Sequence, residues 1–247
     1  NPYQICTPRQ LRAFAICINT GEGNTTSGKY YKLMNDIDLS IYDNWDPIGN
    51  NSAYNNTHRF QGNFDGNEKV VRNLTINNSS DYQGLFGYTI NGTIQNLGIE
   101  NCNVNGEEYV GGLLGYSNNT TISNCYSTGN VSGSSTCVGG LVGYAALSIS
   151  NCYSTANVVG NQNVGGLVGY NQSNISNSYA SGKVKAGGDY VGGLVGRQNY
   201  GNIKNCVAAN DSIITTSIVS NISRVCGNNS GIYYNNYALN VMIIKEG

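Results

Sequence analysis

The sequence repeats one five-residue phrase, which reads Gly111-Gly112-Leu113-Leu114-Gly115, Gly139-Gly140-Leu141-Val142-Gly143, Gly165-Gly166-Leu167-Val168-Gly169 and Gly192-Gly193-Leu194-Val195-Gly196. A degenerate copy, Gln83-Gly84-Leu85-Phe86-Gly87, precedes them. The second position of each copy falls at 84, 112, 140, 166 and 193, so the steps are 28, 28, 26 and 27 residues. A period in this range predicts a solenoid, in which each repeat is one coil that buries its apolar side by stacking on its neighbours.

A second block follows each phrase and sets the secondary structure. It reads Ile122-Ser123-Asn124-Cys125-Tyr126, and returns from Ile149, Ile175 and Ile203. Nine residues after the first three of these isoleucines stand Val131, Val158 and Val184. Each coil therefore has three short apolar segments, rich in β-branched residues and separated by Gly, Asn and Ser, which is typical of strands. We predict an all-β chain, a right-handed parallel β-helix of roughly eight coils.

A leucine-rich repeat is the alternative architecture, because residues 94–99 resemble its strand signature. The return limb of that repeat is usually helical. Here it would contain the glycine phrase, and each Gly costs a helix about 1 kcal/mol. The β-helix is therefore favoured.

The two ends differ from the middle, as expected of a solenoid that must cover its terminal coils. Thr7-Pro8-Arg9-Gln10-Leu11 predicts a helix with Thr7 as N-cap, which would cover the first coil. We expect one β-helix domain over residues 1–247. Its parts are a capping helix and lead-in (1–29), irregular coils (30–81), regular coils (82–210), and a last coil with a closing strand at Val241–Ile244 (211–247).

These repeats resemble the GLUG motif family. The runs Tyr30–Leu39, Trp45–Gly49 and Phe60–Gly66 are similar to the segments that lead such arrays, and Gly227–Gly231 with Asn236-Tyr237-Ala238 is similar to their end. The motif occurs in bacterial surface proteins of the adhesin type and in N-terminal regions of IgA-specific metallopeptidases. The resemblance implies a surface or secreted repeat module. It carries over no catalytic residue, because the motif defines none.

Composition excludes several partners. The net charge is −1 and charged residues make up 11% of the chain, so no basic stripe is available for nucleic acid. No stretch is apolar enough to span a bilayer. Together with the resemblance, this predicts a location outside the cell or on a bacterial surface, after removal of a leader that this sequence does not contain.

The cysteines occupy interior positions. Cys125, Cys152 and Cys206 share one slot of the repeat, which Ser178 and Leu97 fill in other coils. A slot that accepts Leu, Cys and Ser is small and interior, so we expect buried free thiols there. Cys6 and Cys17 flank the predicted helix, and a disulfide between them is left open. No Cys-x-x-Cys spacing is present to suggest zinc.

Two columns of tyrosines follow the repeat. One comprises Tyr88, Tyr116, Tyr144 and Tyr170, and the other Tyr126, Tyr153 and Tyr179. The first is our candidate binding strip for sugar rings or a protein partner. A stacked ladder that only fixes the register is the structural alternative. We favour this interpretation for both tyrosine columns, and more strongly for the column of asparagines that begins at Asn96 and Asn124.

The regular coils contain few side chains that could act as a general acid or base. From Tyr109 to Gly182 there is no Asp, Glu, Lys, Arg or His. A catalytic site would therefore have to use the irregular N-terminal coils, where Asp36, Asp38 and His58 lie. Asp36 and Asp38 are a weak candidate for cation binding. A zinc peptidase motif needs two histidines, and His58 is the single one.

We therefore predict a non-catalytic module, without cofactor, that adheres to a host or microbial glycan or protein. Two alternatives stay open. One is a polysaccharide-processing β-helix enzyme with its site in the N-terminal coils, which would need a carboxylate cluster within about 10 Å. The other is a passive spacer within a larger surface protein.

Overall fold

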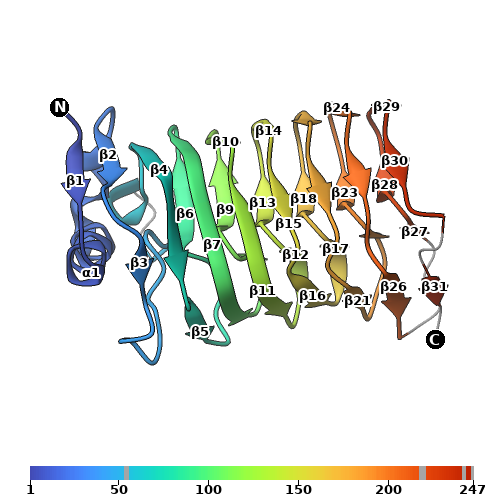
Figure 1. Cartoon of the computed structure of the whole chain (residues 1–247), viewed down its shortest axis with the longest axis horizontal. Coiled ribbons are helices and arrows are strands. Elements are labelled where there is room, and N and C mark those ends of the chain that lie inside the picture. Colours follow the sequence, from blue (N-terminus) through green and yellow to red (C-terminus); the bar gives the residue numbers. More distant parts are fainter. Residues whose placement is uncertain (53–55, 217–220, 241–242, 246–247) are drawn as a thin grey trace.

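The computed structural model describes residues 1–52, 56–216, 221–240 and 243–245. It is a parallel β-solenoid of about eight turns with one helical region at its N-terminal end (Figure 1). Every strand pairing between successive coils is parallel, and equivalent residues of the repeat lie opposite each other, as Ile122 does with Ile94 and Ile149. The predicted β-helix architecture is confirmed, and the leucine-rich repeat is excluded.

The strands form three sheets that run the length of the solenoid. The long sheet has 20 strands. Its strands are β1 (Tyr3–Ile5), β2 (Tyr30–Leu33), β3 (Ile37–Asp38), β4 (Asn63–Arg72), β5 (Thr75–Asn77), β7 (Thr93–Gly106), β10 (Thr121–Ser123), β11 (Tyr126–Gly133), β14 (Ile149–Ser150), β15 (Tyr153–Ser154), β16 (Asn157–Gly160), β19 (Ile175–Ser176), β20 (Tyr179–Ala180), β21 (Val184–Ala186), β24 (Asn202–Lys204), β25 (Val207–Ala208), β26 (Ser212–Thr215), β29 (Ile232–Tyr234), β30 (Tyr237–Ala238) and β31 (Ile243–Lys245).

The two shorter sheets flank the glycine phrase on either side. One comprises β8 (Val110–Gly111), β12 (Thr136–Gly139), β17 (Gln162–Gly165), β22 (Val191–Gly192) and β27 (Ile222–Ser223). The other comprises β6 (Phe86–Ile90), β9 (Leu114–Asn118), β13 (Val142–Ala145), β18 (Val168–Asn171), β23 (Val195–Gln198) and β28 (Cys226–Asn229).

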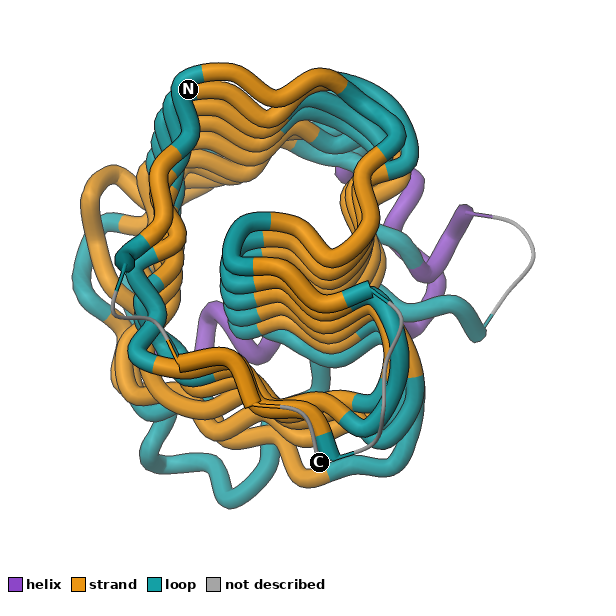
Figure 2. The backbone as a smooth tube through the Cα atoms, turned by 90° about the vertical axis from the view of Figure 1, so that its right-hand side faces the viewer, coloured by secondary structure: helices purple, strands orange, loops and turns teal. Residues whose placement is uncertain are grey.

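Each glycine phrase turns inward. Viewed along the solenoid, one segment of every coil bends into the centre and returns (Figure 2). The carbonyl of Gly140, in the middle of its phrase, accepts a hydrogen bond of 2.7 Å from Ser127 Oγ on the inner side of the long sheet. A Cβ atom at Gly139 would lie 2.6 Å from the backbone nitrogen of Gly169 in the next coil. Glycine is therefore required because two sheets meet there backbone to backbone.

The N-terminal end is closed by a helix. α1 (Pro8–Cys17) begins at the N-cap Thr7, whose side chain accepts from Gln10 N, and Gln10 completes a capping box. The π-helical turn η1 (Ile18–Glu22) and the 3₁₀ turns η2 (Gly23–Thr26) and η3 (Asn56–His58) follow. Leu11 and Ala15 are buried against the first coil, and the Phe14 ring lies 4.6 Å from that of Tyr31. The predicted capping helix is confirmed.

The turns of the long sheet use left-handed asparagines. Asn96, Asn124, Asn151, Asn177 and Asn205 all have φ between 50° and 54°. Asn tolerates this conformation better than most residues. The side-chain amide of Asn124 also donates to Asn96 Oδ1 at 2.9 Å, so the column is both a turn and a hydrogen-bonded ladder.

The eight cysteines are all free thiols. Cys125, Cys152 and Cys206 are buried in one interior column, as predicted. Cys6 and Cys17, whose pairing the sequence left open, are not joined. Of the predicted closing strand, Val241 and Met242 lie outside the described residues, and β31 covers the remainder.

Candidate binding site

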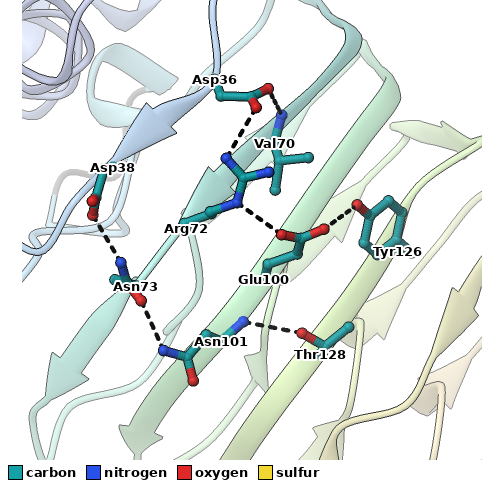
Figure 3. A network of polar contacts seen from close by, with 9 residues as sticks. All are labelled: Asp36, Asp38, Val70, Arg72, Asn73, Glu100, Asn101, Tyr126 and Thr128. Carbon is teal, nitrogen blue, oxygen red and sulfur yellow. Dashed lines mark hydrogen bonds and ion pairs between the residues drawn. The ribbon is translucent and has the colours of Figure 1, made fainter.

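The outer face of the long sheet carries a connected set of polar side chains over the irregular coils (Figure 3). Arg72, at the end of β4, forms ion pairs of 2.9 Å with Asp36 through Nη1 and with Glu100 through Nε. The second oxygen of Glu100 accepts a 2.7 Å hydrogen bond from the hydroxyl of Tyr126. One guanidinium thus orders two carboxylates, and one of these carboxylates orders an aromatic ring from the neighbouring coil.

A second chain of hydrogen bonds runs beside the first. The Asn73 amide donates to Asp38 Oδ1 at 2.9 Å, and Asn73 Oδ1 accepts from the Asn101 amide at 2.7 Å. The backbone N–H of Asn101 then donates to Thr128 Oγ1 at 3.0 Å. The two chains cover the outer surface of β3, β4, β7 and β11 with fixed donors and acceptors (Figure 3).

The carboxylates of Asp36 and Glu100 are held in the ionised form, because the pKa of each is lowered. The pKa of Asp36 is lowered by the hydrogen bond from the Val70 N–H and then by Arg72. That of Glu100 is lowered by the hydrogen bond from Tyr126 and then by Arg72. The pKa of Tyr126 is raised, first by burial and then by its bond to Glu100. Asp36 and Glu100 are therefore hydrogen-bond acceptors at neutral pH, whereas the Tyr126 hydroxyl stays a donor. A general acid for glycoside chemistry needs the opposite shift of its carboxyl pKa.

An aromatic stack begins at this network. The rings of Tyr126, Tyr153 and Tyr179 lie parallel, with centroids 4.8 Å apart at both steps and interplanar angles of 1° and 3°. In the preceding coil the equivalent residue is Gly98. A Cβ atom there would lie 2.6 Å from Tyr126 Cε1, so only glycine lets this ring lie over β7.

A recess of about 250 Å³ opens at this end of the stack. It is lined by Glu68, Lys69, Asn96, Leu97, Gly98, Asn124 and Tyr126. Pockets for drug-sized ligands measure roughly 300–1,000 Å³, so this one suits a unit about as large as a single sugar ring. The recess combines one aromatic wall with amide, carboxylate and ammonium groups.

A larger recess of about 550 Å³ lies on the same face, over β2, β4 and β7. Tyr30, Lys32, Asp65 and Gln95 are among the residues that line it. Asp65 of this recess accepts, through Oδ1, a 3.0 Å hydrogen bond from Asn96, which lines the smaller one.

The tyrosine column predicted as the binding strip lies elsewhere, on the sheet of β6, β9, β13 and β18. Tyr88, Tyr116, Tyr144 and Tyr170 stack with centroid distances of 4.7, 4.4 and 5.1 Å.

Arginines cover both ends of this column. Arg59 lies 4.3 Å from the Tyr88 ring centroid, and Arg197 lies 5.4 Å from that of Tyr170. Every ring face in the column is therefore in contact with a neighbour, which leaves only edges and hydroxyls for a ligand. Binding by this column stays a prediction, restricted to those groups.

The predicted cation pair, Asp36 and Asp38, is divided between the two polar chains. Asp36 engages Val70 N and Arg72, whereas Asp38 accepts from Ser40 N and Asn73. Among the described residues, no three His, Cys, Asp or Glu side chains are grouped as metal ligands would be. The pair stays a prediction without a third acidic ligand beside it.

Sequence reasoning missed Glu100 and treated Tyr126 as scaffold. A signal for Glu100 was present in the sequence, because Gly98-Ile99-Glu100 has a carboxylate where Tyr126-Ser127-Thr128 and Tyr153-Ser154-Thr155 of the next coils have threonine. Its pairing with Arg72 could not be read from the repeat. β4 has a register shift between Asp65 and Lys69, and this shift brings Arg72 opposite Glu100.

Comparisons with known proteins agree with this architecture. The model of the GLUG motif matches residues 106–132, 134–159, 160–185 and 187–214. A crystal structure from Bacteroides ovatus, provisionally named an immunoglobulin A1 protease, superposes with a TM-score of 0.82 at 26% identity, over 100% of this chain and 77% of that one. A solved structure described as "L. reuteri 53608 SRRP" gives a TM-score of 0.30 at 14% identity, over 99% of this chain and 100% of that one.

A curated relative matches only part of the chain. It is a protein of Evansella cellulosilytica, provisionally named a Gly-rich membrane protein, and it is 32% identical over 106 residues. The match covers 40% of this chain and 11% of that relative's length. Within the described residues, no helix has the length and apolar character needed to cross a bilayer. The four matched segments lie in the regular coils, so residues 106–214 of this β-solenoid contain four GLUG motif repeats.

Proposed function

We propose that this solenoid is a non-catalytic glycan-binding module that serves adhesion at a bacterial surface. The observation that carries the proposal is the recess at the end of the tyrosine stack, whose Tyr126 wall is held in place by a hydrogen bond to Glu100 of the Asp36–Arg72–Glu100 group. An aromatic ring supplies contact area at low conformational cost, and the fixed charged groups supply strong hydrogen bonds to hydroxyls.

The charge around the recess favours an uncharged glycan. Arg72 is neutralised from both sides by Asp36 and Glu100, and Lys69 lies next to Glu68. No excess positive charge therefore remains to attract a sulfated or sialylated sugar. The ligand that fits is a neutral, hydroxyl-rich oligosaccharide that also reaches the larger recess beside Asp65.

The name of one relative supports the surface location, and the side chains of this chain argue against the enzyme alternative. The Evansella relative is named a membrane protein, and the Bacteroides relative is named a protease, yet this chain has one histidine. A zinc peptidase of the usual motif needs two. The lowered pKa values of Asp36 and Glu100 also argue against a carboxyl group poised to donate a proton.

The test is a glycan array followed by calorimetric titration of the best neutral ligand. Tyr126→Ala should weaken binding at least about tenfold, since truncation of an aromatic residue at the centre of a binding site costs about 2 kcal/mol or more, and about 1.4 kcal/mol is tenfold. Tyr179→Ala is the matched control, because it truncates the same stack two coils away from the recess. It should leave affinity unchanged.

Three results would contradict the proposal in different ways. If Tyr126→Ala leaves the glycan affinity unchanged and Tyr116→Ala abolishes binding, the binding site is the predicted tyrosine column that contains Tyr116. Turnover of a polysaccharide would establish the enzyme alternative. Binding to no glycan or matrix protein would indicate a spacer.

A further inference from the structure

A third recess, of about 360 Å³, lies away from the glycan site and is lined almost entirely by oxygen-bearing side chains. It lies between the segment that connects β3 to β4 and the segment that connects β5 to β6. The side chains that matter are Asp46, Asn50, Asn78, Ser80, Asp81 and Gln83.

Gln83 is the unusual residue in this recess. It is 3% exposed, and its Nε2 donates a 2.6 Å hydrogen bond to the backbone oxygen of Asp81. That bond fixes which end of the carboxamide is the oxygen. Gln83 Oε1 is buried and has no hydrogen-bond partner among the described residues. A buried acceptor without a partner costs about 1–3 kcal/mol, so its retention needs an explanation.

The repeat shows that this position does not need a polar residue. Gln83 pairs with Val110 of the next coil, and the column continues through Val138, Val164 and Val191. All four valines are buried. Glutamine therefore takes the place of valine at this position of the repeat, and of these five residues Gln83 is the one that lines the recess.

Two carboxylates face the same space. Asp46 has no hydrogen-bond partner among the described residues, and Asp81 uses Oδ1 to accept from Glu108 N at 3.1 Å, which leaves Oδ2. Carboxylate and amide oxygens are the ligands that Ca²⁺ prefers, usually six to eight of them with water completing the shell.

We propose that this recess is a Ca²⁺ site, with the Asp46 carboxylate, Asp81 Oδ2 and Gln83 Oε1 as its protein ligands. Two carboxylates and one amide predict weak affinity, in the range of about 10⁻⁴–10⁻³ M that extracellular modules use. The ion would join the irregular coil that holds Asp46 to the first regular coil that holds Gln83. It would thus stabilise the end of the solenoid that bears the glycan site.

The test uses the whole chain and two probes. Ca²⁺ at 10 mM (about ten times the expected dissociation constant) should raise Tm by about 3 °C, by mass action on the folded state. Tb³⁺, a Ca²⁺ substitute, should luminesce on tyrosine excitation, since Tyr82 also lines the recess. Asp46→Asn and Asp81→Asn should each weaken Ca²⁺ binding at least about tenfold. Asp43→Asn, at an exposed carboxylate of the same β3–β4 segment that does not line the recess, is the matched control and should leave Ca²⁺ binding unchanged.

The Gln83→Val variant distinguishes a role of Gln83 in ion binding from a buried polar group that only lowers stability. It copies the later coils, so it should fold and raise Tm without Ca²⁺, because the unpaired oxygen is removed. The rise in Tm with Ca²⁺ should shrink in this variant. If Gln83→Val raises Tm equally with and without Ca²⁺, or if neither Ca²⁺ nor Tb³⁺ binds, the proposal is wrong. Binding that is lost in Asp43→Asn and kept in Asp46→Asn would overturn it as well.

Discussion

At the scale of single residues, Gly98 and Tyr126 determine the candidate site together. The Tyr126 ring lies over the strand of the preceding coil because Gly98 has no side chain, and this position lets the hydroxyl reach Glu100. The repeat alone would suggest that Gly98 is an arbitrary departure from the tyrosine column. The contact shows that it creates the end of the stack and the wall of the recess.

We predict that Gly98→Ala displaces the Tyr126 ring and breaks its hydrogen bond to Glu100. The free energy of unfolding should fall by about 1–3 kcal/mol, as for other overpacked sites, and the glycan affinity should fall as well. In a Tyr126→Ala background the same substitution should cost almost nothing, because the atom it collides with has gone. A double-mutant cycle by denaturant unfolding measures both. If the losses in free energy of unfolding from Gly98→Ala and Tyr126→Ala are additive, the strain at position 98 comes from the backbone and not from contact with the Tyr126 ring.

At the scale of elements, the glycine phrase is a close contact between two sheets. We predict that Gly139→Ala costs about 3 kcal/mol or more, because the new Cβ would meet backbone atoms of Val142 and Gly169, which cannot rotate away. Gly188→Ala is the control, since its Cβ would approach only Asn161, at 3.1 Å from Oδ1. Comparable loss of Tm in the two variants would contradict this account of the phrase.

The elements also show how far sequence reasoning reached. The period, the strand positions and the N-cap at Thr7 could be predicted, because stacking repeats each coil's pattern and capping is local. The inward direction of the glycine phrase could not, since periodicity does not distinguish an outer turn from an inner one. The candidate glycan site could not be predicted from the sequence, because its geometry depends on the register shift between Asp65 and Lys69, where Asn67 and Glu68 adopt positive φ. The pairing of β7 with β10 and β11 has no shift at the equivalent position, since its register shift lies between Ser127 and Gly129.

At the scale of the whole molecule, each coil contacts mainly its neighbours, so one coil should be removable. Deletion of residues 140–165 joins Gly139 to Gly166 and restores an intact Gly-Gly-Leu-Val-Gly phrase. We predict a folded protein with a lower Tm, because stability in such arrays is a sum of coil and interface contributions. Glycan affinity should be unchanged, since the recess lies on β4, β7, β10 and β11 and their connecting turns. Circular dichroism and calorimetric titration test both points. Loss of binding in a folded deletion variant would show that the site extends into the later coils.

The inward turn also determines where the solenoid can change length. The steps between phrases vary from 26 to 28 residues, yet each phrase keeps its five residues, so the variation is absorbed at the perimeter. The turn that joins β11 to β12, at Ser134 and Ser135, is such a perimeter position. A foreign peptide loop grafted there would project away from the axis, whereas one placed inside the phrase would have to fit in the centre. The solenoid is therefore a display scaffold whose insertion points are set by its glycines.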